Sequence, residues 1–589
     1  MVTENINKEE GHPDHRSHHH ASPHHEPLVQ NHESLVQHPG QGSPHQEHIS
    51  EQKKSAPYLF QKARNYVQGK ERKIGMYGIL LFFVVVGTIL VRLKYLPMES
   101  IWNDAAVHLW YAQKLVLHPI STLLWPTYYL EDYAIPQTIT AVYSLIVGNI
   151  SVAAELMAVT YCVLGVIFIY LLGKELCDKF TGLMAAILLS ANHIYYFYTI
   201  RPLGDVPLLV SVIFLMYALV KLEKENNLRW GIILGLSFLI ALLHKVQSVL
   251  FILAILVYYL LFKRKEMFLS KPYFVSWVIP WGAAIGASIV AAVFLHTKLL
   301  GRVFGLFLQL RGMPFGFEAA GMLKWIFSWY LIPFVIVGIT LVVIYRQRIF
   351  YGPLVLGLCY WLFFEVNVDN TQDRYMLPLL PLAIILAVFA LSELSSFVAS
   401  IPSKKFAKKL TFLLVITAVF FISYQSYTLA DSLAYGKSFT FLGYQEAGQW
   451  LKDNAPDNAI IFAGSPRSIR AFVGREYYNE GHEDSPTIGG PLWWLRGDRY
   501  LEEFHPDDAK QNFEEDLAML VKDHDIFLEI DVWEYTQPKW YWPVSQQSID
   551  YFLSQGFKIV HVVEREVPTE KGMQKMPVIF LFKKDMVAG

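Results

Sequence analysis

Eleven ionisable side chains in this sequence flank long apolar segments, on what we expect to be one side of a membrane. Polar groups at membrane depth are costly and usually line a functional site. Two well separated aspartates with several cations suit a reaction in which a carboxylate takes a proton from a hydroxyl. The cations would stabilise the charge that develops on a departing phosphate. The eleven residues are Asp104, Glu131, Asp132, Arg201, Asp205, His244, Lys245, Arg302, Arg311, Asp373 and Arg374.

The composition limits the class of protein that holds these residues. The 589 residues are 53% hydrophobic and 17% charged, whereas soluble domains are about 25% charged, so a wholly soluble protein is disfavoured. The net charge is −1, without the basic excess of a nucleic-acid binder. Cys162, Cys177 and Cys359 lie in or beside apolar runs, which leaves neither a disulfide framework nor a cysteine-ligated zinc site.

Residues 1–68 differ from the rest of the chain. They hold eleven of the twenty histidines and few aromatic residues. Such a segment cannot bury a core, so we expect a disordered, histidine-rich cytoplasmic tail. It lacks the apolar stretch of a signal peptide. The clusters His18–His20 and His24–His25 could bind a transition metal, and the alternative is a solvated tail.

Apolar segments long enough to cross about 30 Å of hydrocarbon recur from Ile74 onward. Lysine and arginine are retained on the cytoplasmic side of a membrane, so Lys70–Lys73 places the N-terminus in the cytoplasm. Each later lysine- and arginine-rich stretch is likewise expected in the cytoplasm, so the chain must cross the membrane and return between successive stretches. This gives about eleven transmembrane helices, with the C-terminus outside. The expected spans are 74–91, 152–173, 180–199, 206–220, two short helices within 230–262, 273–295, 323–345, 349–365, 375–400 and 410–428.

This topology places the ionisable residues in outer turns and loops. His244 and Lys245 lie at the turn between the two short helices, and Arg201–Asp205 forms another turn. The first outer loop, 94–150, contains the apolar stretch Pro136–Val147, which is too short to span comfortably. We expect that stretch to lie against the membrane surface.

Beyond residue 430 the sequence has the pattern of a separate folded unit. Charges of both signs appear, and helical and strand patterns alternate. We therefore expect a transmembrane domain over 69–430 and an extracytoplasmic α/β domain over 431–589. The lack of cysteine in that second domain suits a prokaryotic surface. The expected strands are 460–463, 526–532, 557–563 and 578–582, and the expected helices are 445–454, 507–522 and 547–555.

Four sequence elements resemble those of the C-type glycosyltransferase superfamily, in particular the protein O-mannosyltransferases and the bacterial lipid A aminoarabinose transferases. The resemblance covers about residues 74–430 and implies the helical membrane fold of that superfamily. The elements are Asn103-Asp104 after the first span, Arg201-Pro202-Leu203-Gly204-Asp205, Lys245 at a helix break, and Asp373-Arg374-Tyr375-Met376-Leu377-Pro378 opening a late span.

The resemblance implies a multi-pass plasma-membrane enzyme that transfers a sugar from a dolichyl or undecaprenyl phosphate to a protein, lipid or glycan acceptor, with inversion. Asp104 takes the position of the base, and Asp205 that of a second acidic residue at the reacting centre. The residues implied to bind the donor phosphate are Arg374, Lys245 and Arg201, and those implied to contact acceptor or sugar are His108, Glu131, Asp132, His244 and Asp373.

The sequence leaves alternative roles open for these residues. Asp104 and Asp205 could cap helices. Arg374 could anchor a helix at the membrane interface together with Tyr375. A divalent cation is not required; if one binds, Asp104 and Asp205 are its candidate ligands. Four tryptophans could stack on sugar rings or pack in a core, namely Trp493, Trp494, Trp540 and Trp542.

Two other functional classes also stay open. A secondary transporter would have paired halves with matching broken helices, which we do not find. An oligosaccharyltransferase would carry Trp-Trp-Asp-Tyr-Gly where this chain has Trp493-Trp494-Leu495-Arg496-Gly497.

The mannosyltransferases typically have Asp-Glu where this chain has Asp104-Ala105. The identity of the sugar and of the acceptor therefore stays open.

Overall fold

Helices form most of the chain in the computed structural model. The structure describes residues 74–96, 98–99, 101–124, 134–294, 318–367, 372–400, 404–456, 459–463, 466–473, 514, 517–533 and 546–586. The predicted tail over 1–68 and its histidine clusters lie outside these residues. So do Glu131, Asp132, Arg302, Arg311 and the four tryptophans that could contact sugar.

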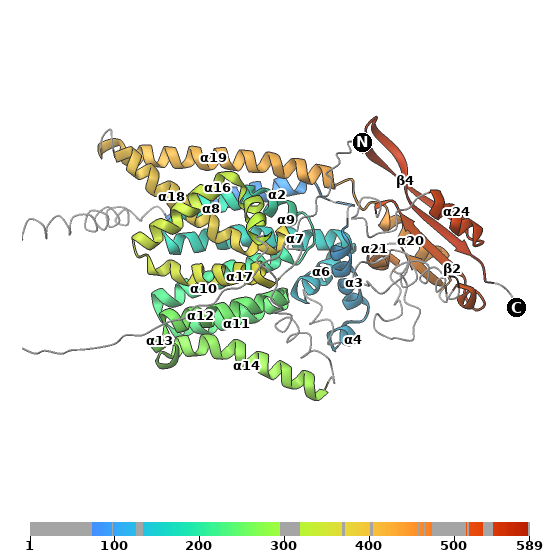
Figure 1. Cartoon of the computed structure of the whole chain (residues 1–589), viewed down its shortest axis with the longest axis horizontal. Coiled ribbons are helices and arrows are strands. Elements are labelled where there is room, and N and C mark those ends of the chain that lie inside the picture. Colours follow the sequence, from blue (N-terminus) through green and yellow to red (C-terminus); the bar gives the residue numbers. More distant parts are fainter. Residues whose placement is uncertain are drawn as a thin grey trace, which may run out of the picture. The chain divides into compact units, whose positions relative to one another are not determined.

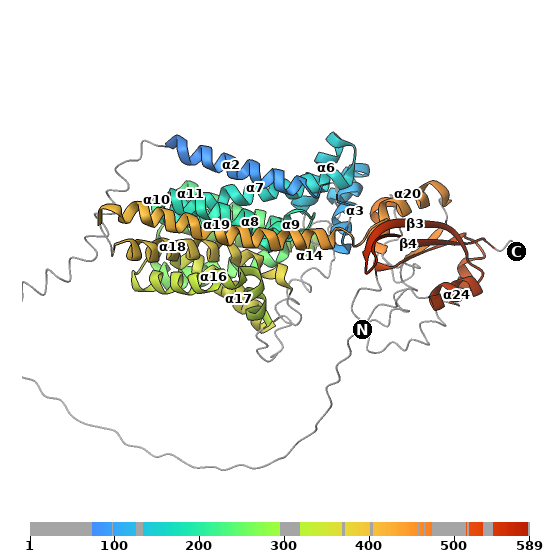
Figure 2. The same ribbon diagram turned by 90° about the horizontal axis from the view of Figure 1, so that it is seen from above.

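Long apolar helices follow one another from Ile74 to Lys437 and run roughly parallel in one bundle (Figures 1 and 2). Each expected span coincides with one or two of them. The helices are α2 (Ile74–Leu93), α7 (Ile150–Leu176), α8 (Lys179–Ala191), α9 (His193–Thr199), α10 (Asp205–Glu225), α11 (Leu228–His244), α12 (Val249–Phe262), α14 (Lys271–Phe294), α16 (Glu318–Ile344), α17 (Tyr351–Asn367), α18 (Leu380–Ser400) and α19 (Lys404–Lys437).

Among the described helices, six are long and apolar enough to cross a membrane, and the bent pair α8 and α9 can supply a seventh. Shorter apolar helices include α11 and α12. The chain is therefore a multi-pass membrane protein. The total of about eleven crossings and the side on which each terminus lies stay predictions.

These helices are broken at three places, and two of the breaks carry predicted polar residues, Lys245 after α11 and Asp373 and Arg374 in the turn before α18. α8 and α9 meet at an angle of 63°, where the Asn192 side chain accepts a hydrogen bond from the backbone of Tyr195 at 3.0 Å. α11 ends at His244, and a short 3-10 turn precedes α12, as the predicted turn requires. A 3-10 helix, η3 (Asp373–Leu379), precedes α18. Irregular backbone at membrane depth is tolerated only where protein or a water-filled cavity surrounds it.

The described residues between α2 and α7 include three short helices: α3 (Asn103–Leu117), α4 (Pro119–Leu124) and α6 (Ala134–Val147). α6 contains the apolar stretch that we expected at the membrane surface. Its Leu145 and Ile146 side chains are exposed, which agrees with a position against lipid. A further short helix, α13 (Arg264–Leu269), connects α12 with α14.

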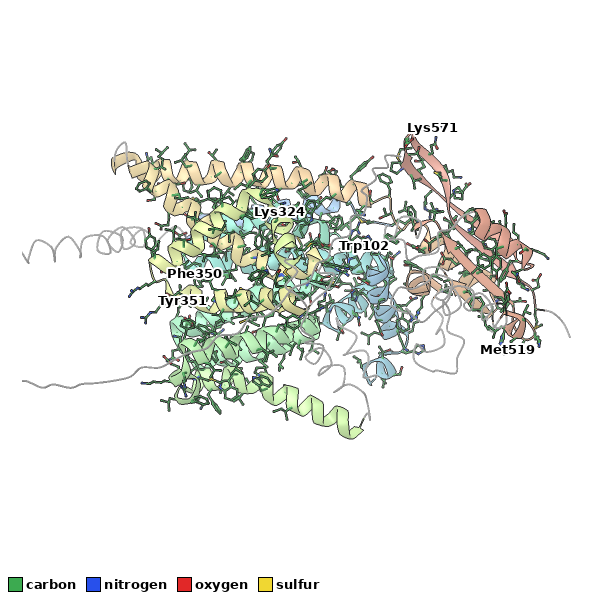
Figure 3. The ribbon with its side chains drawn as sticks, in the orientation of Figure 1. Trp102, Lys324, Phe350, Tyr351, Met519 and Lys571 are labelled. Carbon is green, nitrogen blue, oxygen red and sulfur yellow. The ribbon has the colours of Figure 1, made fainter. Side chains whose placement is uncertain are left out.

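The C-terminal part contains a four-stranded mixed sheet in the order β1-β2-β4-β3. β1 (Ile460–Ala463) and β2 (Ile526–Asp531) are parallel and fully buried, whereas β3 (Lys558–Thr569) and β4 (Gly572–Lys584) form an antiparallel hairpin. Figure 3 labels Lys571 at the tip of that hairpin. The described residues of this part also form α20 (Tyr444–Asn454), α21 (Pro466–Val473) and α24 (Gln546–Ser554).

All four expected strands are present, but the hairpin strands are longer than the apolar runs that predicted them. Charged pairs extend the ladder beyond these runs; Lys575 and Glu564, for example, form an ion pair of 2.6 Å across the two strands. The expected helix over 507–522 is only partly described, and its described end is at Leu520, followed by a turn.

The C-terminal part from α20 to β4, which we call the sheet region, contacts the segment between α2 and α3. We call that segment the first outer segment, because it lies in the expected first outer loop. The Glu99 carboxylate accepts hydrogen bonds from the backbone of Gly443 at 3.0 Å and from Arg565 at 2.7 Å. α21 packs against α3, where the Arg470 guanidinium lies 4.5 Å from the centroid of the Trp110 ring.

Candidate active site

Four predicted residues meet in one charged cluster. Lys245 Nζ lies 2.6 Å from Asp205 Oδ1. Arg374 Nη1 lies 2.7 Å from Asp104 Oδ2 and 4.0 Å from Asp205 Oδ2. Two cations and two carboxylates thus alternate along the cluster, so each charge is next to an opposite one. We call these four residues the charged cluster.

Burial changes along the charged cluster. The Lys245 and Asp205 side chains are each 3% exposed, Arg374 is 12% exposed and Asp104 is 41% exposed. The buried pair therefore forms the inner end. Asp104 forms the open end, where an incoming molecule can reach a carboxylate.

Each member of the charged cluster lies at the end of an element. Asp104 is in the first turn of α3, and Asp205 is the first residue of α10. The N-terminal ends of helices favour negative charge, so both carboxylates lie where the helix dipole attracts them. The N-cap positions belong to Trp102 and Gly204, so neither aspartate is the N-cap that the sequence also allowed.

The two cations flank one aromatic ring. Lys245 Nζ lies 5.2 Å from the centroid of the Tyr375 ring, and the Arg374 guanidinium carbon lies 5.5 Å from it. Cation–π attraction and the bulk of the ring fix the spacing of the two charges. The sequence analysis named Tyr375 only as part of the element that begins at Asp373 and as a possible interface anchor with Arg374, not as a residue that spaces the two cations.

Asp373 holds the backbone next to Arg374 and does not contact the other members of the charged cluster in the ion pairs described above. Its Oδ1 accepts hydrogen bonds of 2.7 Å from the Tyr198 hydroxyl and from the backbone N–H of Arg374. These contacts tie η3 to α9 and hold the backbone that carries Arg374. Asp373 therefore positions a neighbour in this structure, whereas the sequence suggested contact with acceptor or sugar.

His108 lies one helical turn after Asp104 on α3, so both side chains share a face of the helix. His108 is buried, and its Nδ1 lies 3.5 Å from Gln137 Nε2. Burial lowers the pKa of His108 to about 4, while the charges of Asp104 and Asp205 act in the opposite direction. The imidazole is therefore neutral near pH 7.

His244 points away from the charged cluster although it precedes Lys245. Its Nε2 lies 2.5 Å from the Tyr161 hydroxyl, and its Nδ1 lies 3.0 Å from the Ser211 hydroxyl. These contacts join the end of α11 to α7 and α10. The structure places His244 among packed helices, where the predicted contact with sugar has no opening.

Arg201 is also separate from the charged cluster. Its guanidinium is packed between the rings of Trp102, labelled in Figure 3, and Phe197, at 4.2 and 4.5 Å from their centroids. Nη2 donates to the Lys437 carbonyl at 3.4 Å, and Arg201 makes no ion pair with a described carboxylate. Burial lowers the pKa of Arg201 to about 9. Its Nε and Nη1 are buried without a hydrogen-bond partner among the described residues, so a role in binding the donor phosphate stays a prediction.

The described residues do not offer a resident metal site. No group of three histidine, cysteine, aspartate or glutamate side chains gathers in this part of the chain. Asp104 and Asp205 instead face Arg374, and Asp205 also binds Lys245. Their donor atoms are engaged by cations, so we derive no step through a metal ion.

Comparisons with known proteins match part of the chain to one family and much of it to solved structures. Residues 135–296 match a family model described as dolichyl-phosphate-mannose-protein mannosyltransferase. That range includes Asp205 and Lys245 but not Asp104 or Arg374. No curated protein is found to match the sequence.

Solved structures share the fold at low sequence identity. ArnT from Cupriavidus metallidurans, bound to undecaprenyl phosphate, is 11% identical, with a TM-score of 0.54 over 85% of this chain and 97% of ArnT. The oligosaccharyltransferase of Archaeoglobus fulgidus, in its apo form, is 11% identical, with a TM-score of 0.55 over 78% of this chain and 70% of that protein.

These findings confirm the predicted resemblance to the C-type glycosyltransferases and the enzyme class, a glycosyltransferase. The transporter alternative is set aside.

Proposed function

We propose that the protein transfers a sugar from a dolichyl or undecaprenyl phosphate to a hydroxyl-bearing acceptor, with inversion at the sugar carbon. The observation that carries this proposal is the position of Arg374, which contacts the open carboxylate of Asp104 and faces the buried Asp205. The Arg374 guanidinium thereby lies between the proposed base, Asp104, and the buried carboxylate of Asp205, which also pairs with Lys245. The family model and the undecaprenyl phosphate bound to ArnT support a polyprenyl donor.

Asp104 is the base in this proposal. As the acceptor oxygen forms a bond to the sugar carbon, the Asp104 carboxylate takes the hydroxyl proton, and the bond from that carbon to the phosphate oxygen breaks. Attack from the side opposite to the departing phosphate inverts the carbon. The exposure of Asp104 and its contact with Arg374 support this role.

Arg374 and Lys245 bind the phosphate and stabilise the charge that it gains. Arg374 Nε is buried without a hydrogen-bond partner among the described residues. An unsatisfied buried donor costs about 1–3 kcal/mol, so a phosphate oxygen at this position would remove a penalty that the free enzyme carries. Asp205 holds Lys245 in place and is a positioning residue.

We further propose that the reaction takes place at the outer face of a prokaryotic plasma membrane. The N-terminus would be cytoplasmic, and the sheet region would be outside, above a bundle that places the charged cluster on the same side. The acceptor is then a protein or a glycolipid. Lysine- and arginine-rich connections opposite the cluster support this orientation.

An oligosaccharyltransferase-like reaction is the second candidate, because the TM-scores of the archaeal oligosaccharyltransferase and of ArnT are almost equal. Mass spectrometry of glycolipids and glycoproteins from a deletion strain separates the candidates. We expect loss of a monosaccharide addition, restored by the wild-type gene and not by Asp104→Asn. Loss of an asparagine-linked oligosaccharide would favour the second candidate, and unchanged glycoconjugates would count against both.

A further inference from the structure

A polar groove lies outside the membrane helices, between the first outer segment and the sheet region. Its volume is about 540 Å³. Glu99 contributes from the segment between α2 and α3, α20 contributes one wall, and β3 contributes the other. We call it the α20–β3 groove, and the charged cluster is not part of it.

One wall of the groove is aromatic and rigid. The rings of Trp450 and His561 stack with centroids 5.2 Å apart and an interplanar angle of 6°. Phe527 meets the Trp450 ring edge-on at 6.3 Å. An indole held from more than one side offers apolar contact area without losing side-chain freedom when a ligand binds.

The rest of the lining consists of polar groups that are already oriented. Gln449 Nε2 donates to both oxygens of Asp453 at 2.9 and 3.0 Å. Arg565 Nη1 donates to Glu446 at 2.8 Å. Each carboxylate has further lone pairs, and Gln449 keeps an acceptor oxygen. Such a set suits hydroxyl groups, which donate and accept hydrogen bonds at once.

The formal charge of the groove selects among polar ligands. Glu99, Glu446 and Asp453 contribute three negative charges and Arg565 one positive charge, so the lining carries −2. This excess repels phosphorylated or uronic-acid sugars and accepts neutral or amine-bearing ones. We infer that the α20–β3 groove binds a neutral or amino saccharide of the acceptor, an assignment that rests on the proposed function.

The groove is within reach of the proposed base. Glu99 lines the groove and lies five residues before Asp104, and five residues span at most about 18 Å. An oligosaccharide held in the groove can therefore extend toward Asp104. Because Glu99 also binds Arg565 and the Gly443 backbone, both walls are fixed relative to that short segment.

Direct binding tests the inference without any transfer reaction. Purified full-length protein in detergent would be titrated with three probes: a chitosan trisaccharide, its N-acetylated neutral form and a galacturonic acid trisaccharide. We expect the first two to saturate in calorimetry at millimolar concentration or below, and the acidic trimer to bind at least tenfold more weakly. Equal binding of all three, or none at 10 mM, would overturn the inference.

Substitutions locate the binding. Gln449→Ala and Asp453→Asn change exposed side chains of the groove and should weaken chitosan binding at least fivefold. Asp585→Asn is the matched control, because Asp585 is exposed on the same sheet region outside the groove. Equal loss in the control, or no loss in the groove variants, contradicts the assignment.

Donor turnover distinguishes this failure from failure of the proposed function. Hydrolysis of the sugar donor to polyprenyl phosphate should be unchanged in the matched control Asp585→Asn and lost in Asp104→Asn. If the Asp104 variant stays active while groove binding persists, the proposed function fails and the saccharide site stands. If donor turnover behaves as proposed and the groove does not bind sugar, only the saccharide site fails.

Discussion

Arg374 Nη1, at the start of η3, lies 2.7 Å from Oδ2 of Asp104, in the first turn of α3. This contact means that the proposed base and the proposed phosphate ligand are already paired before any substrate binds. A donor phosphate must share the Arg374 guanidinium with Asp104. Binding of the donor and the state of the base are thereby linked through one side chain.

The first prediction concerns the base. Asp104→Asn should lower the rate of transfer by about 10²–10⁴-fold, because an amide cannot take the acceptor's proton. Asp431→Asn is the control. Asp431 also pairs with a cation, since its Oδ1 lies 2.7 Å from Lys94 Nζ, and this pair is not part of the charged cluster. Both proteins should elute as folded, monodisperse particles. More than about a third of wild-type activity in Asp104→Asn would remove this residue from the mechanism.

The second prediction concerns Arg374. Arg374→Ala should raise the KM for the donor, because a contact with the bound phosphate is lost. It should also reduce kcat, because that contact strengthens as negative charge develops on the departing phosphate. Loss of one such donor group commonly costs about 2.7–4 kcal/mol. Arg374→Lys should be intermediate, since an ammonium replaces the charge but not the planar fork. Normal kinetics in both purified variants would leave Arg374 only a structural role.

The third prediction concerns the buried pair. Lys245→Met should destabilise the protein by about 3–5 kcal/mol, because the Asp205 charge would lose its closest partner. Lys94→Met breaks the exposed pair with Asp431 and should cost at most about 1 kcal/mol. Thermal unfolding in detergent measures both.

The double variant Lys245→Met with Asp205→Leu gives a further check of the buried pair. Removing both charges should restore stability without restoring activity, because no unpaired charge is then buried. Equal thermal stability of Lys245→Met and Lys94→Met would contradict the observed burial of the pair.

Part of this site follows from the sequence, and part does not. The two aspartates, Lys245 and Arg374 could be placed together because all four lie at breaks between apolar segments on one side. The direction of a side chain within a break is not encoded in that pattern. Lys245 has extended backbone, with φ −165° and ψ 134°, so it and His244 point to different sides, and the sequence wrongly suggested a shared site.

Arg201 illustrates a second limit of the sequence. It lies in the same turn as Asp205, yet Trp102 and Phe197 enclose its guanidinium away from the charged cluster. Trp102 comes from another segment of the chain, so the pattern near Arg201 gives no sign of it. The strands of the sheet region, by contrast, follow from local apolar runs and were placed correctly.

The fourth prediction is a pH dependence of stability. The pKa of His108 is about 4 in the folded protein and about 6.5 in an unfolded chain. A lowered pKa of a histidine stabilises the fold above pH 6.5, and this contribution is lost as the pH falls from 6.5 toward 4. His108→Gln should flatten that part of the stability curve. His118→Gln, at the exposed end of the same helix, should not.

The fifth prediction tests orientation. In a background without Cys162, Cys177 and Cys359, a cysteine at Gln372 or Lys571 should react with a membrane-impermeant thiol reagent in intact cells. A cysteine at Lys404 should react only after the membrane is opened. The reverse labelling pattern would place the charged cluster on the cytoplasmic side and overturn the proposed location of the reaction.

The bond between Glu99 and Arg565 joins residues separated by 466 positions. During synthesis, α2 and the first outer segment emerge hundreds of residues before β3 exists. This contact of the segment that leads to Asp104 therefore cannot form until nearly the whole polypeptide has been made. A chain that stops before β3 lacks one of the contacts that hold the segment leading to Asp104, and completion of the last hairpin supplies it.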